Sequence, residues 1–135
     1  MKNPKPITRA RRIEMRRKEM QYATRCFYCG ETDIFCFEID HPVTHGLDKD
    51  FKRVVCRNCH RKLEARRDMQ GLTKNGQRNV KESEGEALKR FVLLIAEDQE
   101  TIAETVPDTP PELIAKALQE TAASLRRKLQ SVTIV

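Results

Sequence analysis

Two CxxC pairs constrain this chain more than any other feature of its sequence. Cys26 and Cys29 form the first pair, and Cys56 and Cys59 form the second. Each CxxC turn places two sulfurs on one side of the chain, so two pairs supply the four thiolates of a closed tetrahedral zinc site. A redox dithiol would instead need only one CxxC in a βαβ context. The spacing therefore favours structural zinc, and leaves Cys36 as a small buried apolar residue.

The size of the surrounding segment also favours a bound metal. The chain has 135 residues, of which 39% are hydrophobic and 5% aromatic, so it can form only one small core. The segment 26–69 is too short to bury enough apolar surface by itself. Bound zinc would contribute the missing folding free energy. A large multi-domain enzyme is excluded.

Local patterns predict a strand, loop, strand and helix between the cysteine pairs and after them. Residues 34–41 have strand composition, and Pro42 must end that strand. Residues 51–55 form a second short strand, and residues 57–69 have helical spacing. We therefore expect an α+β protein in which residues 26–69 form a small zinc-stabilised unit.

The flanking segments are predicted to be a basic arm, a linker and a helical hairpin. The arm covers residues 1–25, with a short helix over about 8–23, and the linker covers residues 70–82. In the hairpin, residues 83–135, Ser83 and Glu86 form a capping box, and Thr109 is the expected N-cap of the second helix. That helix carries a single predicted apolar stripe: Leu113, Ala117, Leu118, Thr121, Leu125 and Leu129.

Charge is distributed unevenly along the chain. The net charge is +6, but residues 1–25 contain nine Lys or Arg against two Glu, and residues 82–135 contain six against ten acidic residues. A local excess of positive charge suits a polyanionic partner. The sequence also has no apolar run long enough for a signal peptide or a membrane span, so we expect a soluble, cytoplasmic protein without a membrane partner.

Several polar residues are not explained by the zinc site. Asp40 and His41 are adjacent and would point to opposite faces of a regular strand, but the turn at Pro42 can bring both toward one place. His60 follows Cys59 in the predicted helix, about 100° further round its axis, and can point away from the zinc. One carboxylate and one imidazole would then form a second metal site with open positions for water and substrate. Taken singly, each residue is better explained as a turn or surface group.

In order and spacing, these motifs resemble the HNH endonuclease family. The matching residues are Cys26-x2-Cys29, then Glu38-Ile-Asp40-His41-Pro42, then Gly46, then Cys56-x2-Cys59-His60. The resemblance covers roughly residues 22–70 and implies a ββα-metal fold. It implies that His41 is the general base, that Asp40 and His60 hold a catalytic Mg²⁺ or Mn²⁺, and that cleavage of DNA leaves 5′-phosphate and 3′-hydroxyl ends.

The chain departs from the family pattern at one position. The middle Asn, which typically orients the catalytic loop of family members, is absent, and Asp50 and Phe51 occupy its place. An ionised Asp accepts hydrogen bonds but donates none, so it can replace an Asn only partly. His45 is interpreted as a solvated loop residue in preference to a ligand.

Cations on the predicted helix are the expected DNA contacts. Together with the basic arm they could bind phosphates on both sides of a cut site, although a merely solvated helix face is the alternative for each one. They are Arg57, Arg61, Lys62, Arg66 and Arg67.

Three functional hypotheses follow from the sequence. The first is a metal-dependent HNH endonuclease acting on DNA. The second is a zinc domain that binds nucleic acid without cutting it, and the third makes residues 83–135 a homodimer or partner-docking module.

Overall fold

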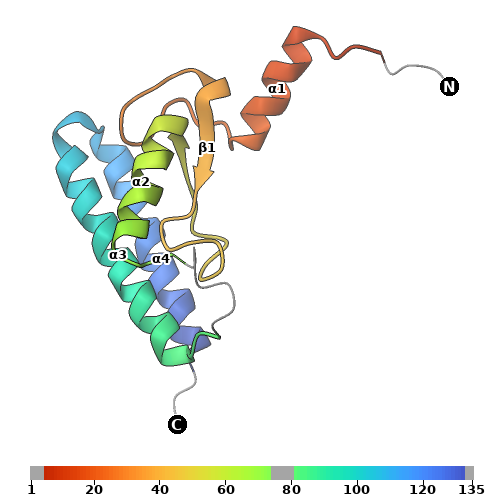
Figure 1. Cartoon of the computed structure of the whole chain (residues 1–135). Helices are drawn as coiled ribbons and strands as arrows, with labels where there is room; N and C mark the ends of the chain where they lie inside the picture. Colours follow the sequence, from red (N-terminus) through yellow and green to blue (C-terminus); the bar gives the residue numbers. More distant parts are fainter. Residues whose placement is uncertain (1–4, 74–80, 133–135) are drawn as a thin grey trace.

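The protein combines helices with one small sheet. A computed structural model describes residues 5–73 and 81–132. Within these ranges the chain forms an antiparallel two-stranded sheet and four α-helices, which confirms the expected α+β class (Figure 1). The helices are α1 (Arg9–Glu19), α2 (Arg57–Met69), α3 (Glu84–Thr105) and α4 (Pro111–Ser131); the strands are β1 (Phe37–Asp40) and β2 (Arg53–Cys56); two 3₁₀ turns are η1 (Ile34–Cys36) and η2 (Val106–Asp108).

Strands β1 and β2 pair along their full length. In their register Phe37 pairs with Cys56, and Asp40 pairs with Arg53. α2 begins directly after β2. The predicted first strand is shortened because the Asp33 carboxylate accepts a hydrogen bond from the Phe35 amide (2.9 Å) and caps η1. Cys36 consequently lies partly exposed on that turn, not buried as predicted.

α3 and α4 lie side by side and are joined by η2 (Figure 1). The Ser83 cap is confirmed, since its hydroxyl oxygen accepts from the Glu86 amide at 3.1 Å. The Thr109 cap is wrong: its hydroxyl donates to the Thr105 carbonyl at 3.0 Å, and Pro110 precedes the helix without a side-chain cap. η2 brings the Thr105 carbonyl within reach of Thr109 and so removes that hydroxyl from the helix end.

The buried face of α4 matches the predicted stripe only in part. Ala117 and Thr121 of the stripe are buried, together with Ser124, and Leu113 packs against the first apolar cluster described below. The other three leucines of the stripe, Leu118, Leu125 and Leu129, are 48%, 46% and 67% exposed. Small side chains let a helix backbone approach its neighbours closely, and this contact orients the leucines toward solvent.

Two apolar clusters connect the cysteine segment to the hairpin. The first joins Phe27, Tyr28 and Val55 to Ile102 of α3 and Ala117 of α4. The second lies under the loop between the strands: Val43, Phe51, Leu72, Phe91 and Leu94. The hairpin and the cysteine segment therefore share their buried interior. No helix in the described ranges has the length and apolar content that crossing a bilayer requires.

A buried ion pair fastens β2 to α3. The Arg53 guanidinium donates to Asp98 Oδ1 and to the Tyr28 hydroxyl, both at 2.7 Å, and lies 4.6 Å from the centre of the Phe27 ring. The side chains of Arg53 and Asp98 are 5% and 1% exposed. Burial raises the pKa of the Tyr28 hydroxyl, so it stays protonated within this network.

We predict that Asp98→Ala destabilises the protein by about 3–5 kcal/mol, because it leaves the buried Arg53 charge without its partner. Equilibrium urea unfolding followed by circular dichroism measures this loss. Glu104→Ala is the matched control, since it removes an acidic partner of Arg66 from the exposed side of the same helix. Equal shifts of the two urea midpoints would contradict a special role for the buried pair.

Candidate metal centre and adjoining polar cluster

The four CxxC cysteines converge on one point. Their sulfurs all lie within 4.8 Å of one another, and the Sγ atoms of Cys29 and Cys56 are 3.5 Å apart. A tetrahedral site with Zn–S bonds of about 2.3 Å places its sulfurs roughly 3.8 Å apart. Donor type, number and spacing therefore fit a structural zinc ion.

Each pair is positioned by a local backbone feature. In the first pair, Gly30 has φ +79°, which allows the chain to reverse so that the Cys26 amide donates to the Glu31 carbonyl at 2.8 Å. The Phe27 amide donates to the Val54 carbonyl at 3.2 Å and attaches this turn to β2. The second pair spans the junction between β2 and α2, where the Cys56 sulfur accepts from the Cys59 amide at 3.4 Å.

Electrostatics also favour a bound cation at this cluster. Burial raises the pKa of the Cys29 and Cys59 thiols. Burial acts in the same direction on Cys56, but hydrogen bonds from the Cys59 amide and the neighbouring thiols outweigh it and lower the pKa. Four crowded sulfurs cannot all ionise without a compensating positive charge. Zinc would supply that charge.

Beside the cysteines, the structure brings Asp40 and His60 together. The His60 Nε2 atom lies 3.5 Å from Asp40 Oδ1 and 3.3 Å from Glu64 Oε1. The other ring nitrogen, Nδ1, is 2.6 Å from Glu38 Oε2. That contact holds the ring in place, and it contributes to the lowered pKa of Glu38. Strand β1 and helix α2 thus converge on one imidazole surrounded by three carboxylates.

Asp40 is also bound by Arg67, a residue that the sequence predicts to contact DNA. Its side chain is 0% exposed, and both oxygens accept hydrogen bonds from Arg67, at 2.7 and 2.8 Å. The sequence predicts a phosphate contact for Arg67 and assigns no role to Glu64. Helical spacing contained the relevant signal, because residues 60, 64 and 67 recur at intervals of four and three and therefore share one face of α2.

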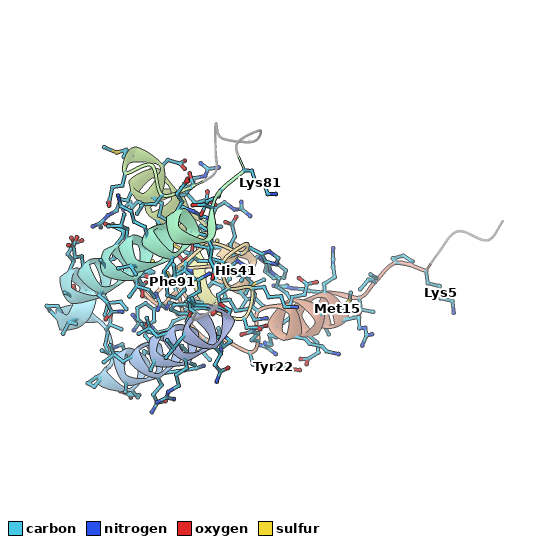
Figure 2. All side chains as sticks on the ribbon, turned by 90° about the horizontal axis from the view of Figure 1, so that it is seen from below. Lys5, Met15, Tyr22, His41, Lys81 and Phe91 are labelled. Atoms are coloured by element: carbon cyan, nitrogen blue, oxygen red, sulfur yellow. The ribbon has the colours of Figure 1, made fainter. Side chains whose placement is uncertain are left out.

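His41 follows Asp40 and is only partly buried. Its ring lies 5.0 Å from the exposed His45 ring, in an edge-to-face arrangement. Burial, with the nearby His45, lowers the pKa of His41. The imidazole is therefore neutral at neutral pH and can accept a proton. In Figure 2 His41 lies in the body of the molecule, away from the projecting α1.

The loop between the strands is held by α4, a contact that sequence analysis did not predict. Asp48 Oδ2 accepts hydrogen bonds from the Ser124 hydroxyl at 2.6 Å and from Arg127 Nη2 at 2.8 Å. Asp50 is exposed, and only its backbone amide bonds to Asp48, at 3.1 Å. Phe51 belongs to the apolar cluster under the loop. Asp48 therefore anchors the loop to α4.

The five predicted DNA-contacting cations are not equivalent. Arg61 and Lys62 are exposed, and Arg57 is exposed but paired with Glu38 at 3.1 Å. Arg66 is bound by Glu97 and Glu104 of α3, at 2.7 and 3.0 Å. With Arg67 committed to Asp40, the freely available positive charge on α2 is smaller than the sequence indicates.

Comparison of the chain with protein-family models, with curated proteins and with solved structures gave no match.

We predict that the purified protein contains about one zinc ion per chain, as expected for one four-thiolate site. Cys59→Ser should lose the zinc and much of the helical signal, because metal binding supplies folding free energy. Cys36→Ser is the matched control and should retain both, since Cys36 is outside the cluster. Mass spectrometry of metal content with circular dichroism tests this, and equal zinc loss in both variants would contradict it.

We predict that the stabilising contact of Asp48 with Arg127 and Ser124 depends on pH. Burial opposes ionisation of Asp48, but Arg127 and Ser124 outweigh it, so its pKa is lowered in the folded state. A carboxyl group whose pKa is lowered by folding stabilises the folded state fully when the pH is above the pKa of the unfolded chain, about 3.9. This stabilisation is lost as the pH falls through the lower pKa of the folded state. At neutral pH the wild type should therefore unfold at a higher temperature than Asp48→Asn. This difference in melting temperature should disappear as the pH falls below about 4.

Thermal melts across this pH range measure the gap directly. Asp50→Asn serves as the control because that neighbouring side chain is exposed. A gap between wild type and Asp48→Asn that stays constant down to about pH 3 would show that the Asp48 charge contributes nothing to stability.

Proposed function

We propose that this chain is a zinc-stabilised, metal-dependent endonuclease of the HNH type, which hydrolyses phosphodiester bonds of DNA. The observation that supports it is the meeting of Asp40 and His60 beside the cysteine cluster. Asp40 ends β1, His41 follows it directly in the chain, and His60 on α2 lies 3.5 Å from Asp40. Strand, strand and helix follow one another in the order that the motif resemblance implies.

In this proposal each polar residue has a separate task. Neutral His41 accepts a proton from the attacking water, whose oxygen bonds to phosphorus while the bond to the 3′ oxygen breaks. The leaving 3′ oxygen takes up a proton from solvent water, so the products are a 5′-phosphate and a 3′-hydroxyl, and His41 returns its proton to solvent. Glu38 holds His60 through Nδ1, which leaves Nε2 available as a ligand.

Asp40 and His60 would hold a divalent cation, Mg²⁺ or Mn²⁺. When bound, this ion would neutralise charge on the scissile phosphate and the leaving oxygen. The donors fit such an ion, because carboxylate oxygens and an imidazole nitrogen suit manganese and carboxylates suit magnesium. Asp40 Oδ1 accepts one hydrogen bond from Arg67, and a carboxylate oxygen has a second lone pair.

One observation favours a second function, the binding of nucleic acid without hydrolysis. Asp40 is 0% exposed and bound through both oxygens to Arg67. A carboxylate in this state serves the fold as a buried ion pair. If Arg67 stays bound to Asp40, so that no metal ion can reach this carboxylate, the zinc-bearing unit would hold DNA through its exposed cations alone.

A plasmid assay separates the two functions. We predict that the protein converts supercoiled plasmid to nicked or linear forms with Mg²⁺ or Mn²⁺, and that His41→Ala lowers the rate by about 10²-fold or more, the usual contribution of a general base. His45→Ala is the matched control, since it removes an exposed imidazole from the same loop. Zinc content should be unchanged in both variants.

Full cleavage by His41→Ala would rule out His41 as the base. Salt-sensitive DNA binding without turnover under either divalent metal would favour the second function.

A further inference from the structure

Helix α1 presents a group of cations that no other part of the described chain neutralises. The helix contains six Lys or Arg and two Glu, so it keeps a net positive charge. Glu19 is paired with Arg16 at 3.2 Å, and Glu14 accepts a hydrogen bond from the Tyr22 hydroxyl at 3.4 Å. The remaining charges are all exposed and have no ion-pair or hydrogen-bond partner among the described residues. We call them the α1 cations: Arg9, Arg11, Arg12, Arg17 and Lys18.

The helix is anchored at one end only. Arg16 donates from Nε to the Ile34 carbonyl at 3.1 Å and from Nη2 to the Phe37 carbonyl, so it links α1 to η1 and to the start of β1. Met20, at the end of the helix, is 7% exposed. Figures 1 and 2 show α1 projecting from the body beyond this attachment. The α1 cations are therefore displayed on an oriented arm.

The arm has no packing partner of its own. None of the 11 residues of α1 is buried. Isolated helices of this length are marginal in water, and closely spaced like charges weaken them further. A polyanion along the helix would remove that repulsion and bind most strongly to the arranged cations.

The composition of α1 favours nucleic acid over a membrane surface. The larger apolar residues of the helix are Ile13 and Met15. Two positions apart on a helix are about 200° apart around its axis, so these side chains form no common face. Binding in a bilayer interface needs such an apolar face, whereas binding to phosphates needs only cations.

Further cations connect the arm to the proposed site. A pocket of about 220 Å³ at the base of α1 is lined by Arg25, Lys52, Lys116 and Glu120, among other residues. Lys116 is paired with Glu120 at 3.9 Å, so the positive charge of this lining comes from Arg25 and Lys52. Lys52 precedes Arg53, the strand partner of Asp40, and therefore lies opposite His41 at the open end of the sheet. Positive charge thus continues from α1 past this pocket to the loop that carries His41.

We propose that α1 is a docked second DNA-binding element, which binds the phosphate backbone of the duplex to one side of the proposed cleavage site. This inference relies on the proposed function for the identity of the polyanion. It adds that the arm, held by Arg16, contributes a large share of DNA affinity independently of the chemistry at His41.

The salt dependence of duplex binding tests this. Fluorescence anisotropy with a labelled DNA duplex, without divalent metal, gives the affinity at several salt concentrations. The triple variant Arg9→Gln, Arg11→Gln, Arg12→Gln should reduce the slope of log K against log salt by up to about 3, since each phosphate contact contributes about 0.9. The matched control is Lys81→Gln, Lys89→Gln, Arg126→Gln, which removes the same charge from exposed positions elsewhere. Equal changes in the two variants would overturn the proposal.

A single-charge comparison tests the docking. Arg16→Gln should weaken duplex binding more than Arg17→Gln does, because only Arg16 bonds to η1 and β1. Equal losses would show that α1 acts as an undirected cluster of charge. Circular dichroism confirms that both variants retain their fold.

The outcomes also separate this inference from the proposed function. An α1-dependent salt slope without plasmid cleavage would leave the arm as a DNA-binding element and remove the nuclease. Plasmid cleavage together with an unchanged salt slope in the triple variant would support the nuclease and rule out α1 as a DNA-binding element. Vesicles containing phosphatidylserine serve as the competing polyanion, and α1-dependent binding to them as tight as to DNA would overturn the choice of partner.

Discussion

The junction between β2 and α2 determines how the rest of the molecule is arranged. Cys56 ends the strand, caps the helix and contributes a sulfur to the cluster, so one residue connects three structural features. The turn that carries Cys26 and Cys29 bonds to β2 through Phe27. A metal ion at the four sulfurs would hold the strand, helix and turn in one orientation. The position of His60 depends directly on that orientation, because it follows Cys59 on α2.

A buried charge network extends from this junction to the hairpin. Asp40 and Arg53 are opposite each other in the strand register, and opposite residues point to the same face of an antiparallel sheet. Asp40 bonds to Arg67 of α2, whereas Arg53 bonds to Asp98 of α3. The end of the sheet is thereby tied to two helices by buried ion pairs. Such pairs specify an arrangement more than they stabilise it, since desolvation offsets much of their attraction.

Local chemistry made some of these features predictable from sequence. The CxxC spacing identified the four sulfurs, Ser83 with Glu86 identified the start of α3, and Asp40 lies near His60 as expected. Tertiary choices were not predictable in this way. Arg66 and Arg67 were expected to contact DNA, but their partners lie on α3 and on β1. The predicted α4 stripe correctly included Ala117 and Thr121, yet Leu118, Leu125 and Leu129 are exposed and the smaller Ser124 is buried instead. Periodicity indicates that a face exists, but the shape of the neighbouring surface decides which residues fill it.

The contact between Asp48 and Ser124 joins residues that are 76 positions apart in the chain. Contacts of such long sequence separation form late in folding, because the entropy of closing the intervening loop must be lost first. During synthesis, the loop after His41 leaves the ribosome well before α4 does. A nascent chain that already carries both cysteine pairs therefore still lacks the anchor of this loop. The arrangement around His41 is therefore completed only after α4 has been made and has folded against this loop.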